Sequence, residues 1–77
     1  MEKELVKHIV ESLVEYPDQI DIHVIEGEKS TILELRVAES DLGKVIGKHG
    51  RIAKAIRALL SASASRTGRR VSLEILD

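Results

Sequence analysis

Val45-Ile46-Gly47-Lys48-His49-Gly50-Arg51 is the stretch that decides how this 77-residue chain is interpreted. Two glycines flank a basic pair, an apolar pair precedes them, and a basic, helix-like segment follows. Glycine has no side chain to block an approaching ligand, and it adopts positive φ where a turn requires it. The N–H groups at the start of a following helix favour an anion. The stretch therefore predicts a turn that binds a sugar-phosphate backbone.

Apolar spacing before the turn predicts one helix and two strands. Residues 2–15 carry an apolar stripe in adjacent pairs every four residues, which is typical of an amphipathic helix. Pro17 ends it, because the residue before proline avoids the α region. Apolar and polar residues alternate over 20–24 and again over 33–37, so both are predicted strands. The polar, glycine-containing residues 26–29 are the predicted hairpin turn between them.

The turn itself is predicted to join two helices that lead to a third strand. Ser40-Asp41 is the expected helix start, with a capping hydroxyl and an acid in the first turn. A short helix then ends at Gly47, and a longer helix runs from Gly50 to a stop near Gly68. Residues 71–75 alternate as a strand. The predicted buried stripe of the long helix is Ile52, Ala55, Ile56, Leu59 and Leu60.

Length and composition restrict the class of protein. The 77 residues are sufficient for one small domain, expected to span 1–77. The chain contains no cysteine, so neither disulfides nor thiolate metal sites are expected. No apolar run approaches the ~20 residues of a membrane span. The charged residues 1–4 do not resemble a signal peptide, so a cytoplasmic location is expected.

Charge is distributed unevenly along the chain. Residues 1–40 carry a net charge of −6, residues 41–70 carry +7, and residues 71–77 carry −2. The positive surplus surrounds the glycine turn, which favours an anion-binding face, although a solvated basic helix has the same composition. Whether Arg66, Arg69 and Arg70 contact such an anion is left open by the sequence.

The motifs and their order resemble a known family. The second half of the chain resembles the core of a KH domain, an RNA-binding module, in its order of a short helix, a Gly-x-x-Gly turn at 47–50, a second helix and a strand. The leading helix, the Tyr-Pro-Asp break at 16–18 and Asp41 to Arg51 (DLGKVIGKHGR) are similar to bacterial stand-alone KH proteins of the KhpA type. The resemblance implies an α+β fold of type II-like order α-β-β-α-α-β, with a three-stranded sheet backed by three helices.

The resemblance also implies a site and a function. Single-stranded RNA of about four nucleotides would lie in a narrow groove beside the turn. The residues implied to form the site are Gly47, Lys48, His49, Gly50 and Arg51 in the clamp, Lys44, Lys54 and Arg57 around it, and Val45 and Ile46 as apolar and largely structural support. The family is associated with self-pairing, with a larger KH-containing partner, with RNA-chaperone activity, and with control of cell shape and cell-wall biogenesis.

Other classes of function are disfavoured by the residues. The glycine spacing matches neither the Walker motif nor the dinucleotide fingerprint, so no nucleotide cofactor is expected. The three histidines lie in separate elements without metal-ligand spacing, and no catalytic constellation is present, so no metal and no enzyme activity are expected. With Tyr16 as the one aromatic residue, base stacking on rings is disfavoured. The alternative function is a protein-interaction module, in which the small side chains of 58–64 form a dimerisation face; the other interpretation of this segment is a close helix–sheet contact within one molecule.

Overall fold

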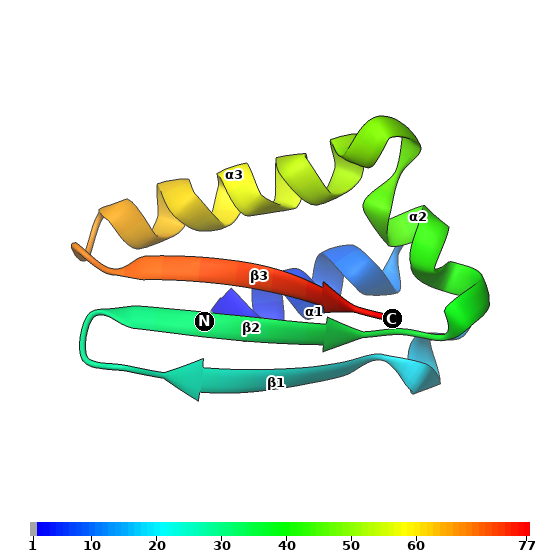
Figure 1. Ribbon diagram of the computed structural model, residues 1–77, viewed down its shortest axis with the longest axis horizontal. Coiled ribbons are helices and arrows are strands. Elements are labelled where there is room, and N and C mark those ends of the chain that lie inside the picture. The colour runs from blue at the N-terminus through cyan, green and yellow to red at the C-terminus, as the bar shows by residue number, and fades with distance from the viewer. Residues whose placement is uncertain (1) are drawn as a thin grey trace.

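The order of helices and strands in the computed structural model, which describes residues 2–77, confirms the predicted α-β-β-α-α-β arrangement (Figure 1). Three short 3-10 turns, at Pro17–Gln19, Glu39–Asp41 and Lys48–Gly50, connect the longer elements. The helices and strands are α1 (Glu2–Glu11), β1 (Asp21–Glu26), β2 (Ser30–Arg36), α2 (Leu42–Ile46), α3 (Arg51–Ser65) and β3 (Arg70–Leu76).

The three strands form one mixed sheet in the order β1-β2-β3. β1 and β2 are antiparallel, and the predicted hairpin joins them, with the N–H of Gly27 donating to the carbonyl of Ser30 over 2.7 Å. β2 and β3 are parallel, from the pair Ser30 and Arg70 to the pair Arg36 and Leu76. A parallel pair needs a long crossover, and α2 and α3 provide it. Each strand begins or ends one to three residues from its predicted boundary.

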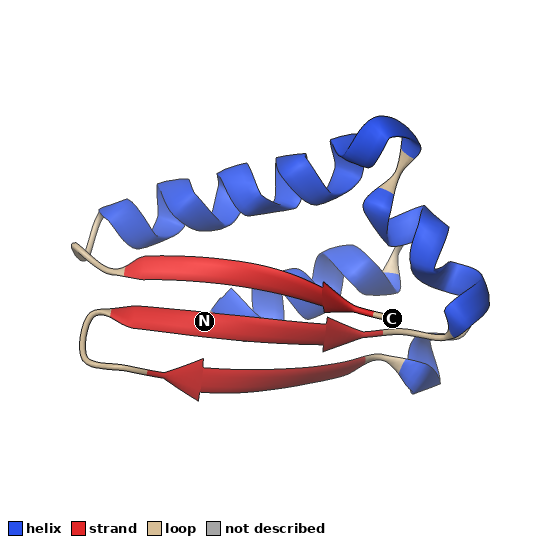
Figure 2. Cartoon of the chain, in the orientation of Figure 1, coloured by secondary structure: helices blue, strands red, loops and turns tan. Residues whose placement is uncertain are grey.

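Among the described residues, α1 and α3 cover one face of the sheet, and α2 joins the same core from beyond the ends of β2 and β3 (Figure 2). α1 contributes Val6 and Val10, and its stripe ends earlier than predicted, because the helix stops at Glu11. Alternate strand residues point to the helices, since side chains in a strand alternate between faces. The buried cluster consists of Val6, Val10, Ile22, Leu33, Leu35, Val37, Val45, Ile56, Leu60 and Leu73.

The predicted buried stripe of α3 is partly wrong. Ala55 is exposed and Leu59 is 53% exposed, whereas Ala53 and Ala64 are 3% and 1% exposed. The helix therefore faces the sheet through a stripe rotated by part of a turn from the predicted one. Ala53 and Ala64 share the buried side of the helix with Ile56 and Leu60.

The prediction that the Ser40 hydroxyl caps the start of α2 is also wrong. α2 is preceded by the 3-10 turn Glu39–Asp41, and no side chain caps either segment. Asp41 is fully buried, and its carboxylate is engaged elsewhere, by backbone N–H groups that follow α1. Because the 3-10 turn leads directly into the helix, its backbone takes the place of a side-chain cap.

Candidate functional site

The Gly47–Gly50 turn has a backbone that few residue types can adopt. Gly47 has φ 77° and ψ 169°, and Gly50 has φ 72° and ψ 15°. Between them His49 has φ 58° and ψ 25°, and it is the only non-glycine residue with positive φ in the described part of the chain. Histidine is among the residues that tolerate this left-handed conformation. Gly47 therefore lies in a region essentially restricted to glycine, whereas His49 and Gly50 share the left-handed helical region.

Two backbone donors at the tip of the turn are available to a ligand. The N–H of Gly47 donates to the carbonyl of Gly43 over 2.8 Å, and that of Gly50 donates to Gly47 over 3.0 Å. Within residues 2–77 no hydrogen bond engages the N–H of Lys48 or of His49. Both residues are exposed, and α3 begins two residues later, so its N-terminal partial positive charge lies beside these donors. The arrangement is suited to an anion.

Cations around the turn differ in their availability. The side chains of Lys48, Arg51 and Lys54 are exposed, and no ion pair engages them in the described residues. Arg57 is tied to the edge of the sheet, because its Nε donates to the carbonyl of Leu73 over 3.2 Å. The turn therefore has three cations that are free to meet a ligand and one that mainly joins α3 to β3.

Lys44 is held by carboxylates. Its Nζ lies 3.3 Å from Oδ1 of Asp41 and 3.6 Å from Oε2 of Glu15. The hydrogen bond to Asp41 and the nearby charge of Glu15 raise the pKa of Lys44 above its ordinary value. The lysine is thus charged, but its charge is compensated within the chain, so it contributes less to the positive face than its sequence position suggests.

Asp41 connects the end of α1 to the start of α2. Its two carboxylate oxygens accept hydrogen bonds from the backbone N–H groups of Glu15 and Tyr16, each over 3.0 Å. Burial acts to raise the pKa of Asp41, but these two hydrogen bonds and the contact with Lys44 outweigh it and lower the pKa below its ordinary value. From the sequence, Asp41 is predicted only as an acid in a first helical turn. Its role in joining α1 to α2 is not visible there, because its hydrogen-bond partners lie 25 and 26 residues away in the chain.

Apolar residues beside the turn divide into core and surface. Val45 is fully buried, so it supports α2 from within the core. Ile46 and Ile52 are half-buried at the two sides of the turn, and Leu42 is half-buried at the start of α2. Of the two apolar residues predicted at the site, Ile46 thus has surface to offer to a ligand and Val45 does not. The half-buried Leu42 and Ile52 also have some.

The remaining arginines lie far from the turn. Arg66, Arg69 and Arg70 follow α3, whose 15 residues place them ~22 Å from its N-terminus. The Nη2 of Arg69 donates to the hydroxyl of Thr31 over 2.6 Å, which fastens it to the start of β2. The basic residues of the segment 41–70 are continuous in the sequence, but in the fold they are divided between the two ends of α3.

No group of three or more His, Asp or Glu side chains in residues 2–77 is arranged to hold a metal ion. The helices of the described part of the chain are also too short and too polar to cross a membrane.

Comparison with known proteins finds close relatives over nearly the whole chain. A family model described as the KH domain of KhpA/KhpB matches residues 3–75. A protein of Borreliella burgdorferi named RNA-binding protein KhpA is 64% identical over 76 residues, covering 99% of this chain and 93% of the relative. Proteins of the same name from Treponema pallidum and Clostridium acetobutylicum are 53% and 51% identical, covering 100% and 96% of this chain and 96% and 99% of the relatives. No solved structure matches the chain.

Proposed function

This chain belongs to the KhpA/KhpB KH-domain family, and from that premise we propose that it binds single-stranded RNA through the Gly47–Gly50 turn. The observation that carries the proposal is the pair of N–H groups at Lys48 and His49, exposed and without a hydrogen-bond partner in residues 2–77. The flanking glycines leave room for a phosphate to reach them. A KH domain holds about four nucleotides by the backbone at such a turn.

Electrostatics would supply most of the affinity. Lys48, Arg51 and Lys54 are exposed cations at the turn and the first turns of α3. Each phosphate that a cation neutralises releases counterions, and for single strands the slope of log affinity against log salt is about −0.7 per phosphate. Three contacts therefore predict a slope of about −2. Few base-specific contacts are needed for such binding, so we also propose an RNA-chaperone or post-transcriptional role in the cytoplasm.

The double variant Lys48→Asp/His49→Asp tests the clamp. It replaces the tip of the turn by two carboxylates, which repel a phosphate from the backbone N–H groups. We expect binding of a fluorescent ten-nucleotide RNA, measured by anisotropy, to fall at least about tenfold, together with a smaller salt slope.

A matched control is present in the same chain. Lys7 and His8 are the same dipeptide, exposed on α1. The variant Lys7→Asp/His8→Asp changes the net charge by the same amount, away from the turn. Equal loss of binding in the two folded variants would show that overall charge matters and the turn does not. Unchanged binding in the turn variant would refute the clamp.

A second candidate function is self-association or pairing with a larger KH-containing protein. One side of α3 is apolar and unpacked, with Leu59 53% exposed beside the exposed residues Ala55, Ala58 and Ala62. These four residues share one face at spacings of three and four, and their small side chains permit two helices to approach closely. Within the predicted segment 58–64, Leu60 and Ala64 are buried in the core, so the proposed dimerisation face consists of the exposed residues beside them.

Light scattering tests self-association, and either outcome leaves RNA binding open because the two functions can use different faces. The monomer has a mass of 8.5 kDa, and association through α3 predicts a species of twice that mass without RNA. Leu59→Lys is expected to return the protein to the monomer while leaving its fold intact, because the side chain is not in the core. A monomer at millimolar concentration, or a dimer that persists in Leu59→Lys, would contradict self-association through this face.

A further inference from the structure

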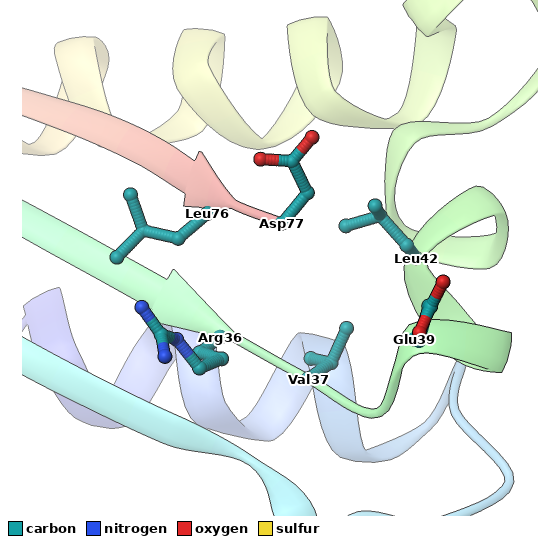
Figure 3. A pocket seen from close by; sticks show the side chains of 6 residues that line it. All are labelled: Arg36, Val37, Glu39, Leu42, Leu76 and Asp77. Atoms are coloured by element: carbon teal, nitrogen blue, oxygen red, sulfur yellow. The ribbon is translucent and has the colours of Figure 1, made fainter.

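A cleft lies at the carboxyl ends of β2 and β3, beside the start of α2. It has a volume of about 610 Å³, within the range of small-ligand sites. Figure 3 shows its six lining side chains arranged around a common space, from the two strand ends on one side and from the start of α2 and the residues before it on the other. The lining residues are Arg36, Val37, Glu39, Leu42, Leu76 and Asp77.

The lining combines an apolar floor with charged groups that lack partners. Val37 is 8% exposed, and Leu42 and Leu76 are half-buried, so all three contribute apolar side chains to the lining. Arg36, Glu39 and Asp77 are exposed, and no hydrogen bond or ion pair engages their side chains within residues 2–77. A ligand that fits has an apolar face, hydrogen-bond acceptors for the guanidinium and donors for the carboxylates.

The cleft is within reach of an RNA strand held at the turn. α2 lies between them, with Leu42 at the cleft and Gly47 at the turn (Figure 1). Five residues of helix span ~7.5 Å, so the two places are about that far apart along its axis. A strand of four nucleotides that follows α2 from the turn brings a base to the cleft.

We propose that this cleft is a guanine-selective subsite, an inference that rests on the proposed RNA binding. Guanine presents two adjacent acceptors, O6 and N7, which match an arginine guanidinium. On its Watson–Crick edge it presents two adjacent donors, N1–H and the N2 amino group, which match the carboxylate of Glu39. Uracil has one donor between two acceptor oxygens. Adenine has neither two adjacent acceptors nor two adjacent donors, and cytosine has two adjacent acceptors but only one donor group. Guanine alone uses both kinds of charged group.

The test compares four ten-nucleotide RNAs by fluorescence anisotropy. One is all uridine, and the others have a single central guanine, adenine or cytosine. A bidentate base contact contributes enough discrimination that the guanine RNA is expected to bind about fivefold or more tightly than the uridine RNA. In Arg36→Gln and Glu39→Gln this preference disappears, whereas binding of the uridine RNA changes by about twofold or less, because the phosphate contacts at the turn remain.

Control variants and a second measurement make the outcome decisive. Arg70→Gln and Glu28→Gln remove the same charges at the opposite end of the β2–β3 pair, and both keep the guanine preference. Guanosine monophosphate, but not uridine monophosphate, is expected to shift the NMR methyl signals of Leu42 and Leu76 in the wild-type protein. Equal binding of all four RNAs, a preference that survives in Glu39→Gln, or unshifted methyl signals overturns the proposal.

The same data distinguish the failure of this proposal from failure of the clamp. If uridine RNA binds and the Lys48→Asp/His49→Asp variant loses it, the clamp stands whatever the base preference. If no RNA binds but guanosine monophosphate shifts the two leucine methyl groups, the clamp is refuted and the cleft is retained.

Discussion

Alanine at Gly47 and alanine at Gly50 are expected to have very different effects on stability. At Gly47 a Cβ would lie 2.6 Å from Cγ1 of Ile52 and 2.9 Å from both its Cβ and its Cδ1. At Gly50 no heavy atom lies within 4 Å of the new Cβ. Rotation of the Ile52 side chain relieves the contacts with Cγ1 and Cδ1, but its Cβ moves only with the backbone. The two glycines therefore differ in space as well as in conformation.

The free-energy costs follow from these geometries. Gly47 lies in a region of backbone space that is essentially restricted to glycine, which costs another residue about 1–3 kcal/mol. Overpacking against Ile52 adds about 1–3 kcal/mol, so Gly47→Ala is expected to lose about 2–6 kcal/mol. Gly50 is in the left-handed helical region, where alanine costs about 1–2 kcal/mol. A domain of this length has only about 4–12 kcal/mol of total stability.

Urea unfolding followed by circular dichroism measures the difference. With a denaturant slope of about 1 kcal/mol/M, the midpoint is expected to fall by about 2 M or more in Gly47→Ala and by about 1–2 M in Gly50→Ala. In an Ile52→Ala background the cost of Gly47→Ala should decrease by about 1 kcal/mol, because two of the three close contacts are gone. Equal midpoints for the two glycine variants, or no coupling to Ile52, would refute the steric argument.

Four further substitutions test other parts of the structure by the same urea midpoint. Leu60→Ala, in the core, should lose about 2–5 kcal/mol, whereas Leu59→Ala should lose about 0.5 kcal/mol or less, and equal losses would contradict the observed rotation of α3. Gly43→Ala should gain about 0.5–1 kcal/mol, because this helical glycine has open space around it, and a loss would reveal a hidden contact. Asp41 stabilises the fold above its unfolded pKa of about 3.8, and this contribution disappears as the pH falls through its lowered folded pKa. The Asp41→Asn variant should therefore be less stable than the wild type at pH 7, and its stability should fall less between pH 7 and pH 3. An equal fall in stability in the two proteins would contradict this role.

The turn could be predicted from sequence because its requirements are local. Two glycines three residues apart, with apolar residues before them and a helical pattern after them, restrict the backbone irrespective of the rest of the fold. Both glycines have positive φ in the structure, a conformation that their lack of a side chain permits. The strands could be predicted from the sequence equally well, since the alternation of apolar and polar residues is a property of near neighbours in the chain.

The electrostatics of the site depended on contacts that the sequence does not display. Lys44 belongs to the basic segment, but Asp41 and Glu15 compensate its charge in the fold. Arg69 belongs to the same segment, yet it lies at the far end of α3 with its guanidinium on Thr31. Counting charges along a chain therefore overestimates the cations that one site can use.

The sequence by itself determined the family, the order of helices and strands and the glycine turn, because each depends on residue types at short spacing. The tertiary structure decided which face of α3 is buried, how Asp41 joins α1 to α2 and which cations remain free. It also brought the ends of β2 and β3 together with the start of α2, which creates the cleft. These features require residues distant in the chain to meet, and their positions follow from how the helices pack on the sheet.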